Sequence, residues 1–182
     1  MKIVAVTGTS KSGKTSTVEY LISRLVEKGF KVGSAKHVHR QDFTIDVYGK
    51  DTWRHSNAGS KRVVCLAEDE VSIIRKEKGQ SYTLEKLSAL YQDEDFDILI
   101  LEGFHWLISS NKDVSKIITA EDAQDAKNRL NETIQPILAI TGKISNTLKG
   151  ESINEIPIID LKDEGELLLN IILKQVLLNN KK

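Results

Sequence analysis

MKIVAVTGTSKSGKTSTVEYLISRLVEKG, residues 1–29, runs from an apolar strand through a glycine-rich turn into an amphipathic helix. Residues 2–7 alternate and then become continuously apolar, which is typical of a buried parallel strand. From Lys14 onward apolar residues recur at helical spacing, and Gly29 supplies a stop signal. Between the two lie residues 8–15, GTSKSGKT, which match the phosphate-loop pattern G-x-x-x-x-G-K-[ST]. Because the motif has the strand–turn–helix context that it requires, the sequence predicts binding of a nucleoside triphosphate.

The residue types in this loop explain how it would bind phosphate. Gly8 and Gly13 let backbone N–H groups turn inward as an anion site, and the helix that follows adds its positive N-terminal end. Lys14 is expected to reach the β- and γ-phosphates as a catalytic cation, and the Thr15 hydroxyl is expected to bind Mg²⁺. The other ligand-binding residues predicted in this segment are Thr9, Ser10, Lys11, Ser12 and Ser16.

Two residues of the loop have less defined expectations. Ser12 is expected to serve only as a small residue that lets the phosphate approach. For Lys11, contact with phosphate, contact with a partner subunit and a solvated position all stay open. The alternative for the whole motif, a glycine- and serine-rich turn that matches by chance, is disfavoured because four of its eight positions are fixed at the right junction.

The composition of the 182 residues limits the kinds of protein that this chain encodes. Acidic and basic residues balance at 26 each, so no overall charge favours nucleic acid or an anionic membrane as a partner. No apolar stretch approaches the ~20 residues that span a bilayer, and no signal peptide is predicted. The single cysteine, Cys65, cannot form an internal disulfide, and its apolar neighbours predict a buried core position. We therefore expect a soluble, cytoplasmic protein.

Strand-like and helix-like segments alternate along the chain. Strands are expected at residues 2–7, 31–36, 62–67, 71–76, 97–103, 116–120, 136–142 and 156–161, and helices at 14–28, 51–60, 83–92, 120–132 and 164–180. This alternation predicts an α/β fold with a doubly wound, mostly parallel sheet flanked by helices, the P-loop NTPase fold. Since no linker-like tract interrupts the pattern, residues 1–182 are expected to form a single P-loop nucleotide-binding domain. Ligands of such a sheet bind beyond the carboxyl ends of its strands.

The last predicted helix, residues 164–180, is apolar on more than one face. A surface helix normally shows one apolar stripe. Two interpretations follow: the helix packs entirely onto the sheet, or one of its faces forms a subunit interface.

A second candidate site element ends the strand at 97–103. Glu102 at the tip of so apolar a strand is suited to coordinate Mg²⁺ or to position a catalytic water, and Gly103 would let the γ-phosphate approach closely. Asp97 at the other end of the strand is about 13 Å away and is not expected to reach the metal. The alternative is a glutamate at the strand end that simply faces solvent.

The segment 36–60, KHVHRQDFTIDVYGKDTWRHSNAGS, is rich in hydrogen-bonding side chains. It follows the second predicted strand, so it is expected at the same sheet edge as the phosphate loop. The residues predicted to bind phosphate or substrate here are Lys36, His37, Arg40, Lys50 and Arg54. Metal binding by His37 and His39, or a merely solvated loop, are the alternatives, because two ligands do not complete a metal site.

The turn after the strand at 136–142 bears only weakly on the choice of base. Residues 141–145, TGKIS, are a degraded form of the Asn/Thr-Lys-x-Asp motif of guanine-binding proteins, and they lack its acid. The tripeptide Asn111–Lys112–Asp113 lies in a polar loop and is interpreted as accidental. A preference for guanine over adenine is therefore open.

Four segments, in order, resemble the molybdopterin-guanine dinucleotide biosynthesis protein B family. They are GTSKSGKT (8–15), VGSAKHVHR (32–40), DVYGKDTWRHSNAG (46–59) and DILILEGF (97–104). The most specific positions are Asp46, Gly49–Lys50–Asp51, Trp53–Arg54 and Ala58–Gly59. The resemblance covers residues 1–105, whereas residues 106–182 agree only in the order of strands and helices. The chain departs from the family in its turn at 141–145 and in its stretch at 106–135.

The resemblance implies a homodimeric GTP-binding protein with weak GTPase activity that uses GTP and Mg²⁺. Such a protein would assist the molybdenum cofactor guanylyltransferase that joins GMP to molybdopterin, forming the dinucleotide form of the molybdenum or tungsten cofactor. Molybdoenzymes are further candidate partners, and the molybdopterin cofactor is a candidate ligand. Carried over by position, Gly8 to Thr15 would hold the phosphates, Glu102 with Gly103 would serve the Mg²⁺ end, and residues 36–54 would close over the ligand.

Two other functions stay open from the residues themselves. A delivery module would hold the pterin cofactor or a metal, with hydrolysis incidental. A small-molecule kinase would need a base for an acceptor hydroxyl, for which Asp42 or Asp46 is a candidate. Slow intrinsic turnover is expected, because no arginine is evident at the γ-phosphate and such a residue contributes ~10³–10⁵ in rate. Arg40 or Arg54, from the same chain or across a dimer, potassium ions and a partner are the alternative sources of this charge.

Overall fold

The computed structural model of the chain describes residues 1–40, 42–76 and 82–178. The chain divides into two compact units, a larger one formed by Met1–His37 and Thr83–Lys182 and a smaller one formed by Val38–Tyr82. Each unit has its own β-sheet. The expectation that residues 1–182 form one nucleotide-binding domain stays a prediction.

The larger unit contains a central sheet, a short hairpin and the helices that connect them. The strands of the central sheet are β1 (Lys2–Gly8), β2 (Val32–Lys36), β5 (Ile98–Glu102), β6 (Ser115–Thr119) and β7 (Ile137–Thr141), and the hairpin is β8 (Ser152–Ile153) with β9 (Ile156–Pro157). The helices are α1 (Lys14–Glu27), α3 (Leu84–Ser88), α4 (His105–Ile108), α5 (Ala123–Asn131), α6 (Ser145–Leu148) and α7 (Leu161–Ile172), with a 3-10 turn (Ala89–Tyr91) and a π-helical turn (Leu173–Leu177).

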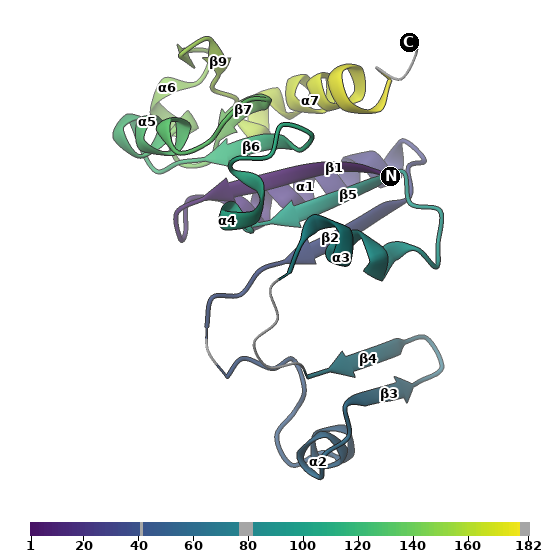
Figure 1. The fold of residues 1–182 in the computed structure, drawn as a ribbon. Coiled ribbons are helices and arrows are strands. Elements are labelled where there is room, and N and C mark those ends of the chain that lie inside the picture. Colours follow the sequence, from purple (N-terminus) through teal and green to yellow (C-terminus); the bar gives the residue numbers. More distant parts are fainter. Residues whose placement is uncertain (41, 77–81, 179–182) are drawn as a thin grey trace. The chain divides into compact units, whose positions relative to one another are not determined.

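All five strands of the central sheet run parallel, in the order β2-β5-β1-β6-β7 (Figure 1). The chain first winds from β1 to β2 and β5, and then to the other side of β1 for β6 and β7. The predicted α/β fold with a doubly wound parallel sheet is confirmed. In register, Glu102 is opposite both Val6 and Lys36, and Gly8 is opposite Thr119. The carboxyl ends of β1, β2, β5 and β6 therefore meet at one edge, where a ligand is expected.

Alternate residues of the central strands face opposite layers of helices. In β1, Val4 and Val6 pack in the core formed with α1 and α7, whereas Ala5 packs in the core formed with α3 and α4. In β5, Ile98 and Ile100 pack in the same core as Val4 and Val6. Burial on both faces explains why these strands read as continuous apolar runs in the sequence.

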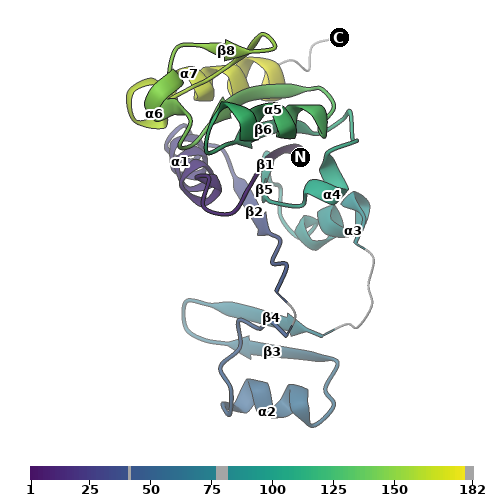
Figure 2. The same cartoon turned by 90° about the vertical axis from the view of Figure 1, so that its left-hand side faces the viewer.

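The smaller unit is a two-stranded hairpin with one helix. Its elements are α2 (Asp51–Asn57), β3 (Arg62–Leu66) and β4 (Val71–Arg75), and the two strands pair antiparallel. Figure 2 shows α2 beside this hairpin. The prediction that Cys65 is a core residue is wrong, because its side chain is exposed. A hairpin of two strands has too few layers to bury every apolar residue that it contains.

The C-terminal elements differ in part from the prediction. Of the strand expected at 156–161, only Ile156–Pro157 is a regular strand, and Ile158 adds a single parallel bridge to Ile140. The side chain of Asp160 accepts hydrogen bonds from two backbone N–H groups of the next turn, which starts α7 at Leu161. A carboxylate cap of this kind ends an extended segment and begins a helix.

The last helix is packed chiefly through one face. Leu168, Leu169 and Ile172 are fully buried against the sheet and α1, whereas Leu167 is exposed. Residues 179 and 180 of the predicted helix lie outside the described residues. Use of an outer face of this helix as a subunit interface stays a prediction.

Candidate functional site

Close backbone approaches determine the shape of the loop between β1 and α1. A Cβ atom on Gly8 would lie 2.0 Å from the carbonyl oxygen of Thr119 in β6, so no larger residue fits there. Gly13 has a φ of 112°, in the left-handed region that favours glycine. Both glycines of the motif are therefore required by the geometry of the loop.

Ser12 anchors the loop to the neighbouring strands. It is fully buried, and its hydroxyl lies 2.6 Å from the Thr119 hydroxyl and 2.9 Å from the carbonyl oxygen of Thr9. A Cβ atom on Gly142, after β7, would lie 2.1 Å from the carbonyl oxygen of Ser12. The sequence suggested only that Ser12 is small, and its anchoring hydroxyl is an additional feature of the structure.

The side chain of Lys14 folds back over the loop. Its Nζ atom donates a hydrogen bond to the carbonyl oxygen of Gly8 at 3.0 Å and another to that of Thr9. Burial lowers the pKa of Lys14, the cations Lys36 and Arg129 act in the same direction, and Glu102 opposes them. The amine therefore lies within the loop, among carbonyl groups that a bound phosphate could replace as its partners.

Three side chains from three elements meet at the start of α1. The Thr15 hydroxyl donates a hydrogen bond to Oε1 of Glu102 at 2.8 Å, and Nζ of Lys36 lies 2.7 Å from the same oxygen. Glu102 is buried at the end of β5, and Lys36 is opposite it at the end of β2. The register of the two strands thus brings a carboxylate and an ammonium group to the hydroxyl that follows Lys14.

These side chains line an open cavity of about 430 Å³. The lining residues are Ser10, Lys11, Gly13, Lys14, Thr15, Ser16, Lys36, His37 and Glu102. Three of these side chains are lysines and one is a carboxylate, so the cavity carries a positive balance that suits a polyanion. The phosphate loop, Lys36, His37 and Glu102, predicted separately from the sequence, are brought together here.

Gly103 lies next to His37, which lines the wall of this cavity. Gly103 follows Glu102 with a φ of 85°, and Phe104 also has a positive φ, of 57°. The ring of His37 lies 5.4 Å from that of Phe104 and 6.1 Å from that of Trp106. His37 is thus part of an aromatic group at the cavity wall.

Lys50 and Arg54 belong to the smaller unit. Lys50 precedes α2, and Arg54 pairs with Asp51 at 3.7 Å on an exposed face. Contact of either residue with a ligand of the phosphate loop stays a prediction.

The oxygen atoms of Thr15 and Glu102 fit the requirements of Mg²⁺. Hydroxyl and carboxylate oxygens are hard ligands, and adjacent ligands of an octahedral Mg²⁺ lie about 3 Å apart. The two oxygens are 2.8 Å apart. Within residues 1–40, 42–76 and 82–178, no three histidine, cysteine or acidic side chains cluster as metal ligands, so the His37–His39 pair gains no third ligand there.

The turn after β7 packs on the phosphate loop. The backbone N–H of Lys143 donates to the carbonyl oxygen of Ser12 at 3.3 Å, while its ammonium group pairs with Glu121 at 2.9 Å. Ser145 stands where guanine-binding proteins carry an acid, and its hydroxyl donates to Asp160 at 2.8 Å. The turn is therefore a structural neighbour of the loop, whichever base is bound.

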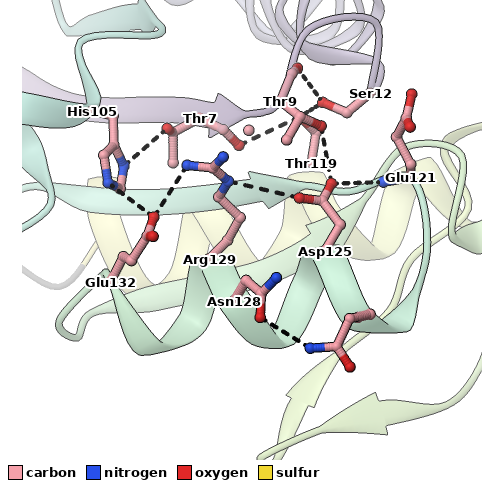
Figure 3. Close-up of polar contacts among 12 residues, drawn as sticks. Thr7, Thr9, Ser12, His105, Thr119, Glu121, Asp125, Asn128, Arg129 and Glu132 are labelled. Atoms are coloured by element: carbon pink, nitrogen blue, oxygen red, sulfur yellow. Dashed lines mark hydrogen bonds and ion pairs between the residues drawn. The ribbon is translucent and has the colours of Figure 1, made fainter.

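A polar network on α5 was not predicted from the sequence. Asp125 and Arg129 lie on this helix and Glu132 caps its C-terminal end, and the three connect to Thr9 of the loop and to His105 (Figure 3). Their spacing of four and three residues is the only signal in the sequence, because it places them on one helix face. That face is seen to lie against the loop only once the sheet order is known.

Among the residues that the structure describes, no helix has the length and apolar character needed to cross a bilayer.

The parallel sheet, the glycine-rich loop at the end of β1 and the acid at the end of β5 define the class of this protein as one with a P-loop NTPase-like α/β fold. A solved structure of Bacillus subtilis MobB matches it with a TM-score of 0.75 at 23% identity, covering 97% of this chain and 98% of that one. The family model for molybdopterin guanine dinucleotide synthesis protein B (MobB) matches residues 3–143. The chain belongs to this family.

Two relatives have similar sequences. A molybdopterin-guanine dinucleotide biosynthesis adapter protein of Haemophilus influenzae is 36% identical over 102 residues, which cover 56% of each chain. A putative adapter protein of Methanocaldococcus jannaschii is 30% identical over 122 residues, covering 67% of this chain and 48% of that one. The chain thus matches about half the length of these two relatives.

Proposed function

We propose that this protein is a GTP-binding adapter with weak GTPase activity that assists assembly of the guanine-dinucleotide form of the molybdenum or tungsten cofactor. The biosynthetic role is that named for its relatives. Nucleotide binding is a further step, which we argue from the residues of the cavity.

The observation that carries the nucleotide proposal is the meeting of Lys14, Thr15, Lys36 and Glu102 at one loop. Lys14 and Lys36 would offset the charge of a triphosphate, and the loop backbone would donate to its oxygens. The Thr15 hydroxyl and the Glu102 carboxylate would hold Mg²⁺, which neutralises charge on the β- and γ-phosphates when bound. The chain's own contribution is therefore to bind, orient and partly neutralise the phosphates.

Guanine rather than adenine is proposed from the family role, since the product cofactor is a guanine dinucleotide. The turn at 141–145 lies beside the phosphate loop, where Lys143 is exposed and pairs with Glu121, so a base that contacts Lys143 would compete with this ion pair. Competition between GTP and ATP for the same site tests this choice directly.

A homodimer is proposed through the hairpin of the smaller unit. Val64, Leu66, Val71 and Ile73 are exposed, and Val64 is paired with Ile73 and Leu66 with Val71. These four side chains, which we call the hairpin face, form an apolar surface on a two-stranded sheet, an element that is marginal without further packing. A second copy of the same face is the proposed cover.

A pterin ligand is a second candidate for the same cavity. Trp106 is half-exposed and lies edge-on to His37, which lines the cavity. A flat heterocycle stacks well on aromatic rings of this kind. Quenching of the Trp106 fluorescence by a pterin, lost in Trp106→Leu, would support this ligand.

The principal experiment is an equilibrium titration with a fluorescent, non-hydrolysable GTP analogue in the presence of Mg²⁺. Lys14→Ala should bind about 10- to 100-fold more weakly, because hydrogen bonds from a charged donor are lost. Lys28→Ala, at the far end of α1, is the matched control and should bind as the wild type does.

Hydrolysis and partnership are measured separately. Phosphate release from GTP should be slow, and it should not depend on added acceptor hydroxyls, since dependence would indicate a kinase. Binding of purified molybdenum cofactor guanylyltransferase, detected by calorimetry, tests the adapter role. Unchanged affinity in Lys14→Ala would refute the phosphate-loop assignment, whereas failure to bind the transferase would refute the adapter role alone.

A further inference from the structure

The α5 network touches the phosphate loop on both sides of its first glycine. The hydroxyl of Thr9, directly after Gly8, donates a hydrogen bond to Oδ2 of Asp125 at 2.9 Å. The hydroxyl of Thr7, directly before Gly8, lies 3.4 Å from Nδ1 of His105. Figure 3 shows these two contacts at opposite ends of one row of side chains.

Arg129 joins the two ends of this row. Its Nε atom lies 3.7 Å from Oδ1 of Asp125, and its Nη1 atom lies 3.2 Å from Oε2 of Glu132. The same Glu132 oxygen lies 3.7 Å from Nε2 of His105. One guanidinium therefore stands between two carboxylates, and each carboxylate leads to a residue that flanks Gly8.

Asp125 is itself held in place. Its Oδ2 atom also accepts a hydrogen bond from the backbone N–H of Glu121 at 3.0 Å, and its own N–H donates to the helix-capping Asp122 at 2.9 Å. Its side chain is largely buried, with 17% of its surface exposed. A largely buried carboxylate that accepts a backbone hydrogen bond and lies 3.7 Å from a guanidinium nitrogen has little freedom, so it can fix the rotamer of Thr9.

We propose that Asp125 is a positioning residue for the phosphate loop, and that Asp125, Arg129 and Glu132 together form a clamp that holds Thr9 directly and Thr7 through His105. This inference deepens the proposed function and rests on it, since the loop must bind phosphate for its shape to matter. The carbonyl groups of Gly8 and Thr9 are the ones that Lys14 contacts. By fixing these two residues, the clamp determines the position of the Lys14 amine in the protein without phosphate.

The clamp also adds charge next to the loop. Arg129 and Asp125 both act on the electrostatic environment of Lys14, in opposite directions. Arg129 does not line the cavity, so its role is to hold the two carboxylates rather than to touch the ligand. Removal of Arg129 should therefore matter less than removal of Asp125.

The first test needs no nucleotide. Amide hydrogen exchange of residues 8–13 is measured in the ligand-free protein for wild type, Asp125→Ala, Thr9→Val and the double variant. Each single variant should exchange about 10-fold faster in this segment, and the double variant should be no faster than either single one, because both changes remove the same hydrogen bond. Thr9→Ser keeps the hydroxyl and should restore the wild-type rate.

The second test uses the GTP analogue with Mg²⁺. Asp125→Ala and Thr9→Val should each weaken binding about 10-fold, and the double variant should bind no more weakly than either one. Asp125→Asn, which keeps an accepting oxygen, should lose less affinity. Asn128→Ala is the matched control, because Asn128 lies on the same helix and its side chain accepts a hydrogen bond from Gln124, which is not part of the network. The thermal midpoint of each variant is recorded to separate positioning from unfolding.

The possible outcomes separate the two proposals. Unchanged loop exchange in Asp125→Ala, or independent additive effects of the two changes, would overturn the clamp even if GTP binds well. Faster loop exchange in a protein that binds no GTP in any form would support the clamp and overturn the proposed function. A general loss of exchange protection over the whole sheet would show that Asp125 is only a stability residue, which also contradicts the proposal.

Discussion

Lys36 and Glu102 form an ion pair of 2.7 Å across the carboxyl ends of two adjacent strands. The Oε1 atom of Glu102 in this pair also accepts a hydrogen bond from the Thr15 hydroxyl. Glu102 is buried, whereas the side chain of Lys36 is about half exposed, 55%. A buried carboxylate needs a compensating partner, and here a cation and a hydroxyl donor supply it. The same carboxylate is suited to hold a divalent cation, so the pair links the fold of the sheet to its proposed chemistry.

Replacing Glu102 by glutamine tests its charge without changing its shape. Without Mg²⁺, the carboxylate repels a triphosphate, so Glu102→Gln should bind the GTP analogue several-fold more tightly than the wild type. With Mg²⁺ the order should reverse, because a metal ligand is lost, and phosphate release should fall by at least about 10-fold. Titrations with Mg²⁺ and with a chelator measure both effects. Glu27→Gln, on the exposed end of α1, is the control, and equal Mg²⁺ enhancement in both variants would rule out Glu102 as a metal ligand.

Gly142 is predicted to be needed for the shape of the phosphate loop. Alanine at this position would place Cβ 2.1 Å from the Ser12 carbonyl oxygen, in addition to the strain of a φ of 96°. Gly150→Ala is a close control, because Gly150 has a φ of 78° but nothing within 4 Å of the added Cβ. The control should lose about 1–2 kcal/mol of unfolding free energy from backbone strain alone. Gly142→Ala should lose more and should also bind the GTP analogue less well, and equal losses in the two variants would contradict the close approach.

Stability should depend on pH through His105. Burial lowers the pKa of His105 below its ordinary 6.5, with Arg129 acting in the same direction and Glu132 opposing them. The unfolded chain therefore binds this proton at a higher pH than the folded protein, so protonation favours unfolding. The contribution of His105 is complete above about pH 6.5 and is lost as the pH falls through the folded-state pKa.

Urea unfolding at about pH 7.5 and about pH 5.5 measures this dependence. His105→Gln should lose less unfolding free energy between the two pH values than the wild type does. His55→Gln, in the smaller unit, should behave as the wild type. A variant at His105 that keeps the full pH dependence would assign the effect to other groups.

The hairpin face should control the oligomeric state. Val64→Glu combined with Ile73→Glu places two like charges directly opposite each other on an apolar surface, so a dimer through this face should dissociate to monomers. Light scattering after size exclusion reports the mass. Val26→Glu, at another exposed apolar position on α1, should leave the mass unchanged. A double variant that stays dimeric would place the interface elsewhere, and the last helix would be the next candidate.

Much of the fold could be predicted because its signals are local. The strand at the N-terminus, the glycine loop and α1 are contiguous in the chain, and their glycines are needed for backbone reasons alone. The apolar runs that become β5 and β7 are equally local, because burial on two faces leaves no polar positions in them. Cys65 shows the limit of this reasoning, since an apolar run predicts a core only where a second layer covers it.

The phosphate loop, GTSKSGKT, and the class of fold that contains it could be predicted without a structure, because strand, turn and helix are encoded by residues that are neighbours in the chain. The side chains that surround the loop depend instead on tertiary packing. Strand register brings Lys36 and Glu102 to Thr15, and helix packing brings Asp125 to Thr9. These partners are separated from the loop by about 20 to more than 100 residues, so no local pattern could reveal them.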